Sequence, residues 1–475
     1  MQTAIVFFRQ DLRLSDNPAL RAAIESADEV IPVYVFDPEE TTGGASRWWL
    51  HHSLASLAAE LKKRGAELVL LKGGSNTALV EFCKSTKATS VHWNRTYDPR
   101  SIARDTELKA RLREQGLQAE SYRGNLLFEP WEICNQGKLP FRVFTPFWRV
   151  CTARLDEVPV PLPEPRSIRG SQIQGVPLAS LELLPRIPWY RGFSIWEPGQ
   201  GGAQRALKKF VADAANNYLV GRDSPHIAGT SRLSPHLHFG EISSRQVLAY
   251  IRSAQTADGH AGFVENSNAF LRQIGWRDFA HHIMFAFPGI ARDPLDSKFA
   301  AFKWRTDTQS LTAWQQGRTG IPIVDAGMRE LWVTGWMHNR VRMIVGSFLT
   351  KNLLIDWQEG LRWFDDTLVD ADIANNAFGW QWIAGCGADA APYFRIFNPI
   401  AQSERFDPQG DYLKRWLPEL AEVPLPWVHK PFECPPLLLS AAGVTLGREY
   451  PSPIVDLKST RDRALEQWTA LRGSR

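Results

Sequence analysis

The first 125 residues alternate short apolar runs with longer runs in which apolar residues recur every three or four positions. The short runs are rich in β-branched and aromatic residues, as strands buried on both faces of a sheet are. Gly65 and Gly116 closely follow two of the longer runs, where helices commonly end on glycine. This alternation predicts an α/β fold with a doubly wound parallel sheet. The predicted strands are 4–8, 30–36, 68–71, 91–93 and 118–122, and the predicted helices are 18–26, 47–64, 76–84 and 103–114.

The pattern changes twice along the rest of the chain. Residues 126–198 follow neither period and are rich in proline, which predicts a long linker on the surface. From residue 199 the helical period resumes and predicts an all-α second domain. We expect the sheet domain at 1–130, the linker at 131–198 and the helical domain at 199–475. The predicted helices of that domain are 203–216, 243–253, 264–285, 323–332, 338–353 and 361–368, with a short charged helix at 459–472.

Composition limits the class of protein. With 475 residues, 44% hydrophobic and 22% charged, the chain is typical of globular proteins with two or more domains. No apolar run approaches the ~20 residues that span a bilayer, and the chain begins directly in a strand pattern, so we expect a cytoplasmic protein. The net charge of +4 does not by itself indicate nucleic acid. The five cysteines lack C-x-x-C spacing, so we expect neither a disulfide framework nor a metal site.

The segment with the most unusual chemistry is 370–382, which reads D-A-D-I-A-N-N-A-F-G-W-Q-W. Two carboxylates, three amides and two indoles within one short stretch suit a site for a flat, polar, redox-active ring. The Asn pair and Gly379 are unfavourable inside a helix. The alternative is a helix end with solvated carboxylates and two core tryptophans. No G-x-G-x-x-G motif follows the first strand, so a nucleotide site is expected elsewhere than in the sheet domain.

Three further motifs precede this segment. Residues 7–18 read F-F-R-Q-D-L-R-L-S-D-N-P, residues 229–240 read G-T-S-R-L-S-P-H-L-H-F-G, and residues 334–343 read T-G-W-M-H-N-R-V-R-M. In this order the four motifs resemble the photolyase/cryptochrome flavoproteins, most closely the microbial class I photolyases that repair cyclobutane pyrimidine dimers. The resemblance extends from residue 3 to about residue 420. It implies a deoxyribodipyrimidine photo-lyase, in which electron transfer from photo-excited FADH⁻ repairs the dimer.

The resemblance places FAD in the helical domain. Hydroxyls and backbone N–H groups in 230–234 precede a predicted helix, an arrangement that suits a phosphate, although a plain N-cap has the same composition. Arg342 is expected to pair with Asp370, because a buried carboxylate needs a cation, and Asn376 is implied to face the flavin N5. The implied FAD contacts are Tyr218, Thr230, Ser231, Arg232, Leu233, Ser234, Phe270, Arg277, Arg342, Asp370, Ala371, Asp372 and Asn376.

The resemblance also assigns roles in electron transfer and DNA binding. Trp380, Trp357 and Trp304 match the family's tryptophan chain, which carries electrons from the surface to the flavin. Trp276 and Trp382 match the aromatic walls around a dimer flipped out of UV-damaged DNA. Taken singly, any of the three tryptophans in the chain is more simply explained as core packing. The implied DNA and dimer contacts are Arg222, Gln273, Trp276, Asn339, Arg340, Met343, Trp382 and Gln402.

One position departs from the pattern of the dimer photolyases. Gln273 stands where those enzymes usually carry Glu, and an amide cannot deliver a proton as a carboxylic acid can. Photolyases of (6-4) photoproducts often carry Gln there, but they have two histidines where this chain has Asn339 and Met343. A cryptochrome photoreceptor is the other alternative. A second antenna chromophore, folate or deazaflavin, stays open. Ser101 stands where folate-binding members carry Glu, which counts against folate without establishing a deazaflavin. We expect a monomer.

Overall fold

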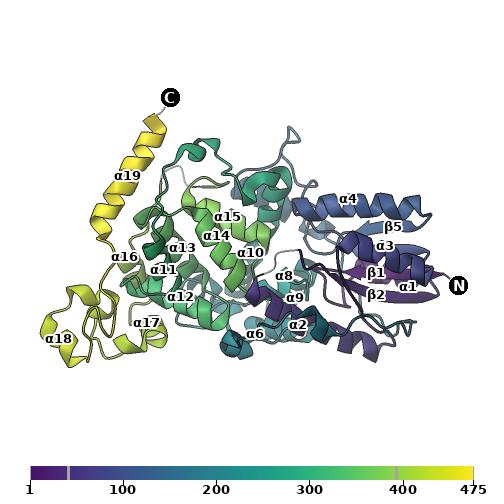
Figure 1. Cartoon of the computed structure of the whole chain (residues 1–475), viewed down its shortest axis with the longest axis horizontal. Helices are drawn as coiled ribbons and strands as arrows, with labels where there is room; N and C mark the ends of the chain where they lie inside the picture. Colours follow the sequence, from purple (N-terminus) through teal and green to yellow (C-terminus); the bar gives the residue numbers. More distant parts are fainter. Residues whose placement is uncertain (1, 40–42, 391–393, 474–475) are drawn as a thin grey trace.

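The computed structural model describes residues 2–39, 43–390 and 394–473. Its N-terminal part is a sheet of five parallel strands in the order β3-β2-β1-β4-β5, shown at the N-terminal side of Figure 1. This confirms the predicted doubly wound sheet. The strands are β1 (Thr3–Phe8), β2 (Glu29–Phe36), β3 (Val69–Lys72), β4 (Ser90–Asn94) and β5 (Gln118–Tyr122), and the helices between them are α1 (Pro18–Ser26), α2 (Gly44–Lys63), α3 (Ser75–Thr86) and α4 (Pro99–Glu114).

The central strand β1 is buried on both faces, as its continuous apolar run predicts. Ala4, Val6 and Phe8 face one core, into which α1 and α2 also pack. Ile5 and Phe7 face the opposite core, which is covered by α3 and α4. The alternation follows from the pleat of a strand, in which successive side chains point to opposite faces.

Helix α4 begins four residues before its predicted start. The side chain of Asp98 accepts a hydrogen bond from the backbone N–H of Ser101, and Pro99 follows as the first helical residue. An Asx N-cap followed by proline is a strong helix start. Ser101, the position that bears on folate, therefore lies in the first turn of α4.

The proline content predicts that the segment 126–198 is irregular throughout, but the structure shows regular elements within it. It contains α5 (Phe144–Ala153) and three short 3₁₀ turns. Phe144 and Phe147 are fully buried, and the Phe144 ring stacks on that of Trp276 at a centroid distance of 3.6 Å. Pro146 falls in the first turn of α5, where its missing N–H costs no helical hydrogen bond. The prediction of a linker throughout 126–198 is therefore wrong for 144–153, where Pro146 stands at a helix start.

The C-terminal part is helical, which confirms the predicted all-α architecture, and it fills the centre of Figure 1. The central helix α15 packs against α10, α13 and α14. The predicted helix 338–353 is α13 followed by one π-helical turn, Phe348–Asn352. The helices are α6 (Gln200–Asp213), α7 (Tyr218–Gly221), α8 (Ser234–His238), α9 (Ser244–Asp258), α10 (Ala261–Ala286), α11 (Thr308–Gln315), α12 (Pro322–Thr334), α13 (Asn339–Ser347), α14 (Trp357–Thr367), α15 (Ile373–Ala384), α16 (Pro399–Phe406), α17 (Asp411–Trp416), α18 (Pro436–Ala441) and α19 (Leu457–Gly473).

Helix α15 contains the Asn pair and Gly379, which the sequence analysis treats as unfavourable for a helix. The side chain of Asp372 caps it by accepting from the backbone N–H of Asn375, and Gly385 ends it with φ +92°. One face of the helix, including Trp380, is buried against its neighbours. The N-cap and tertiary packing thus outweigh the poor helix propensity of asparagine and glycine.

The motif 7–18 joins the sheet to the helices. Arg13 is fully buried and donates to the backbone oxygen of Gly240, and Asp16 forms an ion pair of 2.8 Å with Arg245. Burial lowers the pKa of Arg13 to about 10. Buried charges are tolerated where they are paired and hydrogen-bonded, so this network fixes the two parts of the chain against each other. Among the described residues, no helix is both long and apolar enough to cross a membrane.

Candidate functional site

The helical part contains a cavity of about 660 Å³ between α10, α13, α14 and α15. This volume lies within the range of cofactor and ligand sites. It brings together most of the residues assigned to the dimer and DNA, and three of those assigned to FAD. The predicted site residues that line it are Arg222, Gln273, Trp276, Asn339, Arg340, Arg342, Met343, Asp370, Asn376, Trp380 and Trp382.

Asp370 forms the buried ion pair expected of it. One guanidinium nitrogen of Arg342 lies 2.9 and 3.1 Å from the two carboxylate oxygens, and the hydroxyl of Ser234 donates to the same carboxylate at 2.6 Å. The Arg342 Nε donates to the backbone oxygen of Met337. The predicted pair is therefore confirmed. Through Ser234 it also ties the segment 230–234 to the cavity wall.

Asp372 has a different environment from Asp370, although only one residue separates them. Its Oδ1 caps α15, while its Oδ2 lies 3.4 Å from Nε2 of His281 and 3.9 Å from Nδ1 of His238. Burial alone would raise the pKa of this carboxyl, but the two histidines hold it well below its usual range. Asp372 is thus held as a charged carboxylate at the N-cap of α15.

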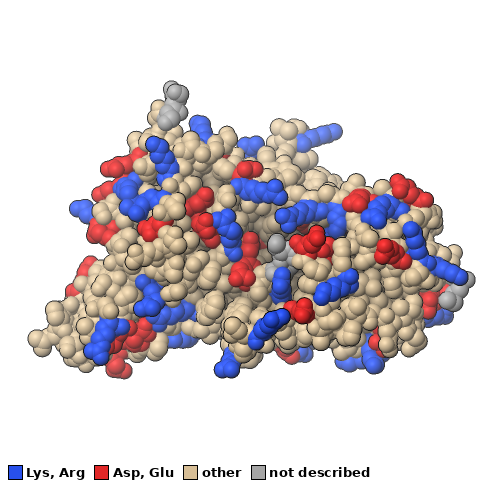
Figure 2. Space-filling model, in the orientation of Figure 1, with Lys and Arg blue, Asp and Glu red and all other residues tan. Residues whose placement is uncertain are grey.

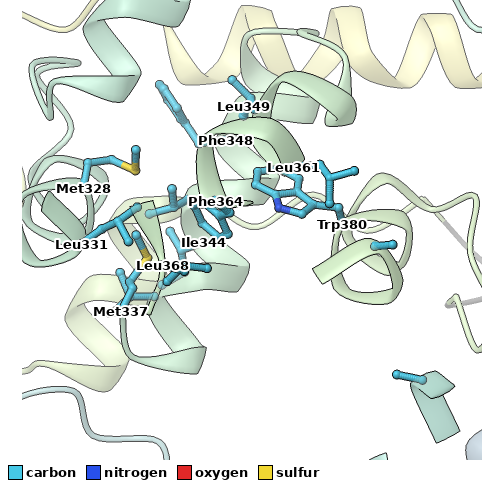
Figure 3. Close-up of a cluster of buried hydrophobic side chains, with 14 of the residues drawn as sticks. Met328, Leu331, Met337, Ile344, Phe348, Leu349, Leu361, Phe364, Leu368 and Trp380 are labelled. Atoms are coloured by element: carbon cyan, nitrogen blue, oxygen red, sulfur yellow. The ribbon is translucent and has the colours of Figure 1, made fainter. Parts of the chain in front are cut away.

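Trp380 lies between the cavity and the helical core. Its side chain is buried, and among the described residues its indole Nε1 has no hydrogen-bond acceptor. Figure 3 shows it at the edge of the apolar cluster, beside Leu361. Its ring packs on Phe364 at a centroid distance of 5.0 Å, and a Cβ added at Gly360 would overlap it. Glycine at 360 therefore leaves the space that the indole occupies.

The other two tryptophans of the predicted chain, Trp357 and Trp304, differ in exposure. Trp357 is the first residue of α14, one turn before the Gly360 that abuts the Trp380 ring, and it is buried. Trp304 is partly exposed, and the backbone N–H of Arg305 beside it donates to the oxygen of Leu354 at 2.7 Å. Of the three tryptophans only Trp304 reaches solvent, as the outer end of a route from the interior to the surface requires. That electrons follow this route stays a prediction.

Aromatic and cationic side chains form the part of the cavity wall to which the resemblance assigns dimer and DNA contacts. The Trp276 ring has Phe144 on one face, and the indole N–H of Trp382 donates to the backbone oxygen of Asp389. Arg340 forms an ion pair of 2.6 Å with Asp223. These contacts hold both tryptophans in defined positions at the cavity. Over the face of the molecule shown in Figure 2, basic and acidic side chains are interspersed.

Other predicted site residues do not line the cavity. Arg277 donates to the backbone oxygens of Asn125 and Leu237, which indicates a structural role in joining segments. Tyr218 and Phe270 pack ring against ring at 5.5 Å. The predicted site residues outside the cavity lining are Trp304, Trp357, Asp372, Tyr218, Thr230, Ser231, Arg232, Leu233, Ser234, Phe270, Arg277, Ala371 and Gln402.

Sequence reasoning missed part of the cavity lining. Most of the missed residues are apolar or glycine, and such residues carry no chemical signature that separates a site from a core. Asn375 was visible as a member of the Asn pair but had no role assigned. The missed residues are Gly346, Phe364, Leu368, Asn375, Phe378, Gly379, Ile383, Asp389 and Arg395.

Comparison with known proteins agrees with this architecture. Residues 4–166 match the family model described as DNA photolyase, and residues 270–470 match the FAD binding domain of DNA photolyase. The chain is 48% identical over 473 residues to a deoxyribodipyrimidine photo-lyase of Agrobacterium fabrum, and the match covers 98% of each protein. The chain belongs to the photolyase/cryptochrome family. The cavity thus lies mostly within the region that matches the family's FAD binding domain.

Both branches of the photolyase/cryptochrome family occur among the similar proteins. Cryptochrome-2 of Arabidopsis thaliana is 41% identical, over 96% of this chain and 77% of that protein. The crystal structure of a bacterial class III photolyase from Agrobacterium tumefaciens superposes with a TM-score of 0.96 at 47% identity, covering 100% of this chain and 98% of that one. Class I membership therefore stays a prediction. Because one fold hosts both repair and signalling, the function has to be argued from the site.

Proposed function

We propose that this protein is a light-driven deoxyribodipyrimidine photo-lyase that repairs cyclobutane pyrimidine dimers in DNA. The observation that carries the proposal is the cavity, which combines the aromatic walls Trp276 and Trp382 with arginines and the buried Trp380. No purely structural role accounts for this set of residues around open space. The test is blue-light illumination of the reduced protein with dimer-containing DNA, scored for restored bases.

The residues around the cavity fit FAD as the cofactor. The indole N–H of Trp380 and the amide of Asn376 offer polar atoms at the wall, and the Asp370–Arg342 pair supplies fixed charge. FAD in its reduced form FADH⁻ supplies an electron to the dimer when it absorbs light. The side chains of this chain orient the cofactor, hold its charge and exclude water. The segment 230–234 would hold the diphosphate, next to Asp370.

The dimer would enter the same cavity after flipping out of the duplex. A lesion that is already poorly paired costs less to extrude than an intact base pair, which contributes to selectivity. Trp276 and Trp382 would stack on it, and Arg222 and Arg340 would hold flanking phosphates. Phosphate contacts add affinity without sequence preference.

Binding to DNA is expected to depend on salt. Arg222→Gln should reduce the log–log salt slope by roughly one unit, because one phosphate contact releases about one counterion. Arg111→Gln is the matched control, since Arg111 lies on α4, pairs with Glu107 and is far in sequence from the cavity. Fluorescence anisotropy with lesion-bearing and undamaged duplexes at several salt concentrations measures the slope. An unchanged slope in Arg222→Gln would contradict the proposed phosphate contact.

Gln273 tests the choice of lesion. Its Nε2 donates to the backbone oxygen of Ala269 at 3.2 Å. The second N–H and the side-chain oxygen are left to bind a ligand in the cavity. We expect Gln273→Glu to raise dimer affinity or quantum yield by up to about tenfold, which corresponds to ~1.4 kcal/mol. Gln115→Glu, on the exposed end of α4, controls for the added charge. A loss of dimer repair in Gln273→Glu would show that the neutral amide is required.

The (6-4) photoproduct is the less favoured substrate. The positions that carry histidine in those enzymes are occupied here by Asn339 and Met343, whose side chains approach each other at 4.0 Å. His338 is adjacent, but it is buried and does not line the cavity. Burial lowers its pKa to about 4, so it is neutral near pH 7 and lacks the charged form. A cryptochrome role is the second candidate, because a relative at 41% identity bears that name and Gln273 departs from the repair pattern.

A further inference from the structure

Asp365 is a carboxylate outside the residues assigned to the site, and it contacts one of them. It lies on α14, and its Oδ1 accepts a hydrogen bond of 2.6 Å from Nδ2 of Asn376. The second acceptor for the same nitrogen is the backbone oxygen of Leu361, at 3.3 Å. A backbone carbonyl only accepts hydrogen bonds, so the NH₂ group of Asn376 must point towards α14.

This arrangement decides which atom Asn376 presents to the cavity. Both hydrogens of the amide are used on α14, and among the described residues no donor reaches its Oδ1. Asn376 lines the cavity. An amide fixed in this way acts towards a ligand as an acceptor only. A carbonyl oxygen favours a ring nitrogen that bears hydrogen over one that carries a lone pair.

We propose that Asp365 is a positioning residue that fixes Asn376 as an acceptor towards the cavity and thereby favours reduced flavin, which bears hydrogen at N5. This inference rests on the proposed function and on the place beside N5 of FAD that the family resemblance implies for Asn376. Hydrogen bonds to ring nitrogens are among the ways in which a protein tunes a flavin. Asp365 thus acts on the cofactor through Asn376 and does not touch it.

Burying the carboxylate of Asp365 costs free energy, and packing between helices does not require a carboxylate at this position. Burial raises the pKa of its carboxyl to about 6, although the Asn376 hydrogen bond and nearby His238 oppose the shift. Among the described residues, no lysine or arginine forms an ion pair with it, and Asp372 adds like charge. The adjacent Asp366 has a separate structural use, because its Oδ1 accepts from the backbone N–H of Gly44 at 2.9 Å. The two neighbours therefore form a matched pair for mutation.

The test is the two-electron midpoint potential of bound FAD in the full-length protein. Asp365→Leu removes the acceptor, frees the Asn376 amide to rotate and is expected to lower the potential by about 30 mV, a tenfold loss of preference for the reduced form. Asp365→Asn retains an acceptor and should stay within about 10 mV of wild type, on the same scale. Asp366→Leu, the same change one residue along, should leave the potential unchanged. Asp365→Ala is measured beside the leucine variant in case the latter does not fold.

A second background separates positioning from a general effect of charge. In Asn376→Ala, Asp365→Leu should produce no further shift, because the residue through which it acts is gone. The inference is overturned if Asp366→Leu shifts the potential as much as Asp365→Leu does. It is also overturned if Asp365→Leu adds its full shift in the Asn376→Ala background, or if neither Asp365→Leu nor Asp365→Ala shifts the potential. If the wild type binds no FAD, both this inference and the proposed function are wrong. Normal FAD binding with unshifted potentials overturns the inference alone.

Discussion

Replacing Trp380 with phenylalanine is expected to slow blue-light reduction of bound FAD at least tenfold, while FAD stays bound. Phenylalanine still packs against Phe364 and Gly360, but a phenyl ring is far harder to oxidise than an indole. A tenfold lower rate corresponds to ~1.4 kcal/mol in the barrier. The measurement is the loss of oxidised-flavin absorbance under illumination with an external reductant. The same variant, reduced chemically beforehand, should still repair dimers, because the electrons are already on the flavin.

Trp314→Phe is the matched control for this prediction. Trp314 is fully buried and its ring centroid lies 6.3 Å from that of Trp380, but it is not part of the proposed chain. It should photoreduce at close to the wild-type rate. Trp357→Phe and Trp304→Phe should be slowed as Trp380→Phe is. Unchanged photoreduction in all three chain variants would contradict the tryptophan route.

Arg342→Leu is expected to lower the free energy of unfolding by about 3 kcal/mol, because it leaves the Asp370 carboxylate buried and without its cation. The side chain of Asp370 is only 3% exposed, and Ser234 would be its remaining polar partner. FAD affinity should fall with stability, since the pair lines the cavity. Urea unfolding of the apoprotein measures the first effect and flavin titration the second.

Two further variants test whether the unpaired charge is the cause. Arg222→Leu also removes an arginine from the cavity wall, but Arg222 lies 4.0 Å from a partly exposed Asp223, and its loss should cost less than about 1 kcal/mol. Asp370→Asn in the Arg342→Leu background should recover much of the lost stability, because no unpaired charge remains. Equal unfolding energies for wild type and Arg342→Leu would contradict the role assigned to the pair.

The periodicity of the chain predicted most of the elements, because strands buried on both faces and amphipathic helices leave clear patterns. Helix α15 escaped prediction, since its helical state depends on the Asp372 cap and on packing against α10, α13 and α14. Helix α5 escaped for a related reason: Pro146 looks like a breaker unless its place in the first turn is known. Local propensity is thus a weak guide where caps and tertiary contacts decide.

The candidate site was predictable where chemistry and spacing coincide. The pairing of Asp370 with Arg342 followed from the need of a buried carboxylate for a cation, and the structure confirms it. Asp365 had no such signal, because its contact with Asn376 joins two helices and appears only in three dimensions. The same holds for Phe378, an apolar residue that lines the cavity from α15. Lining residues of this kind cannot be separated from core residues by type alone.

The most direct test of the proposed function is repair by the chemically reduced protein, with oligonucleotides that contain either a cyclobutane pyrimidine dimer or a (6-4) photoproduct. Each is illuminated with blue light or kept in the dark, and restored bases are quantified by chromatography. We predict that bases are restored from the cyclobutane dimer in the light only, and that the (6-4) photoproduct is unchanged. Failure to restore bases from either lesion would contradict repair and favour a photoreceptor, while restoration from the (6-4) photoproduct alone would contradict the proposed substrate.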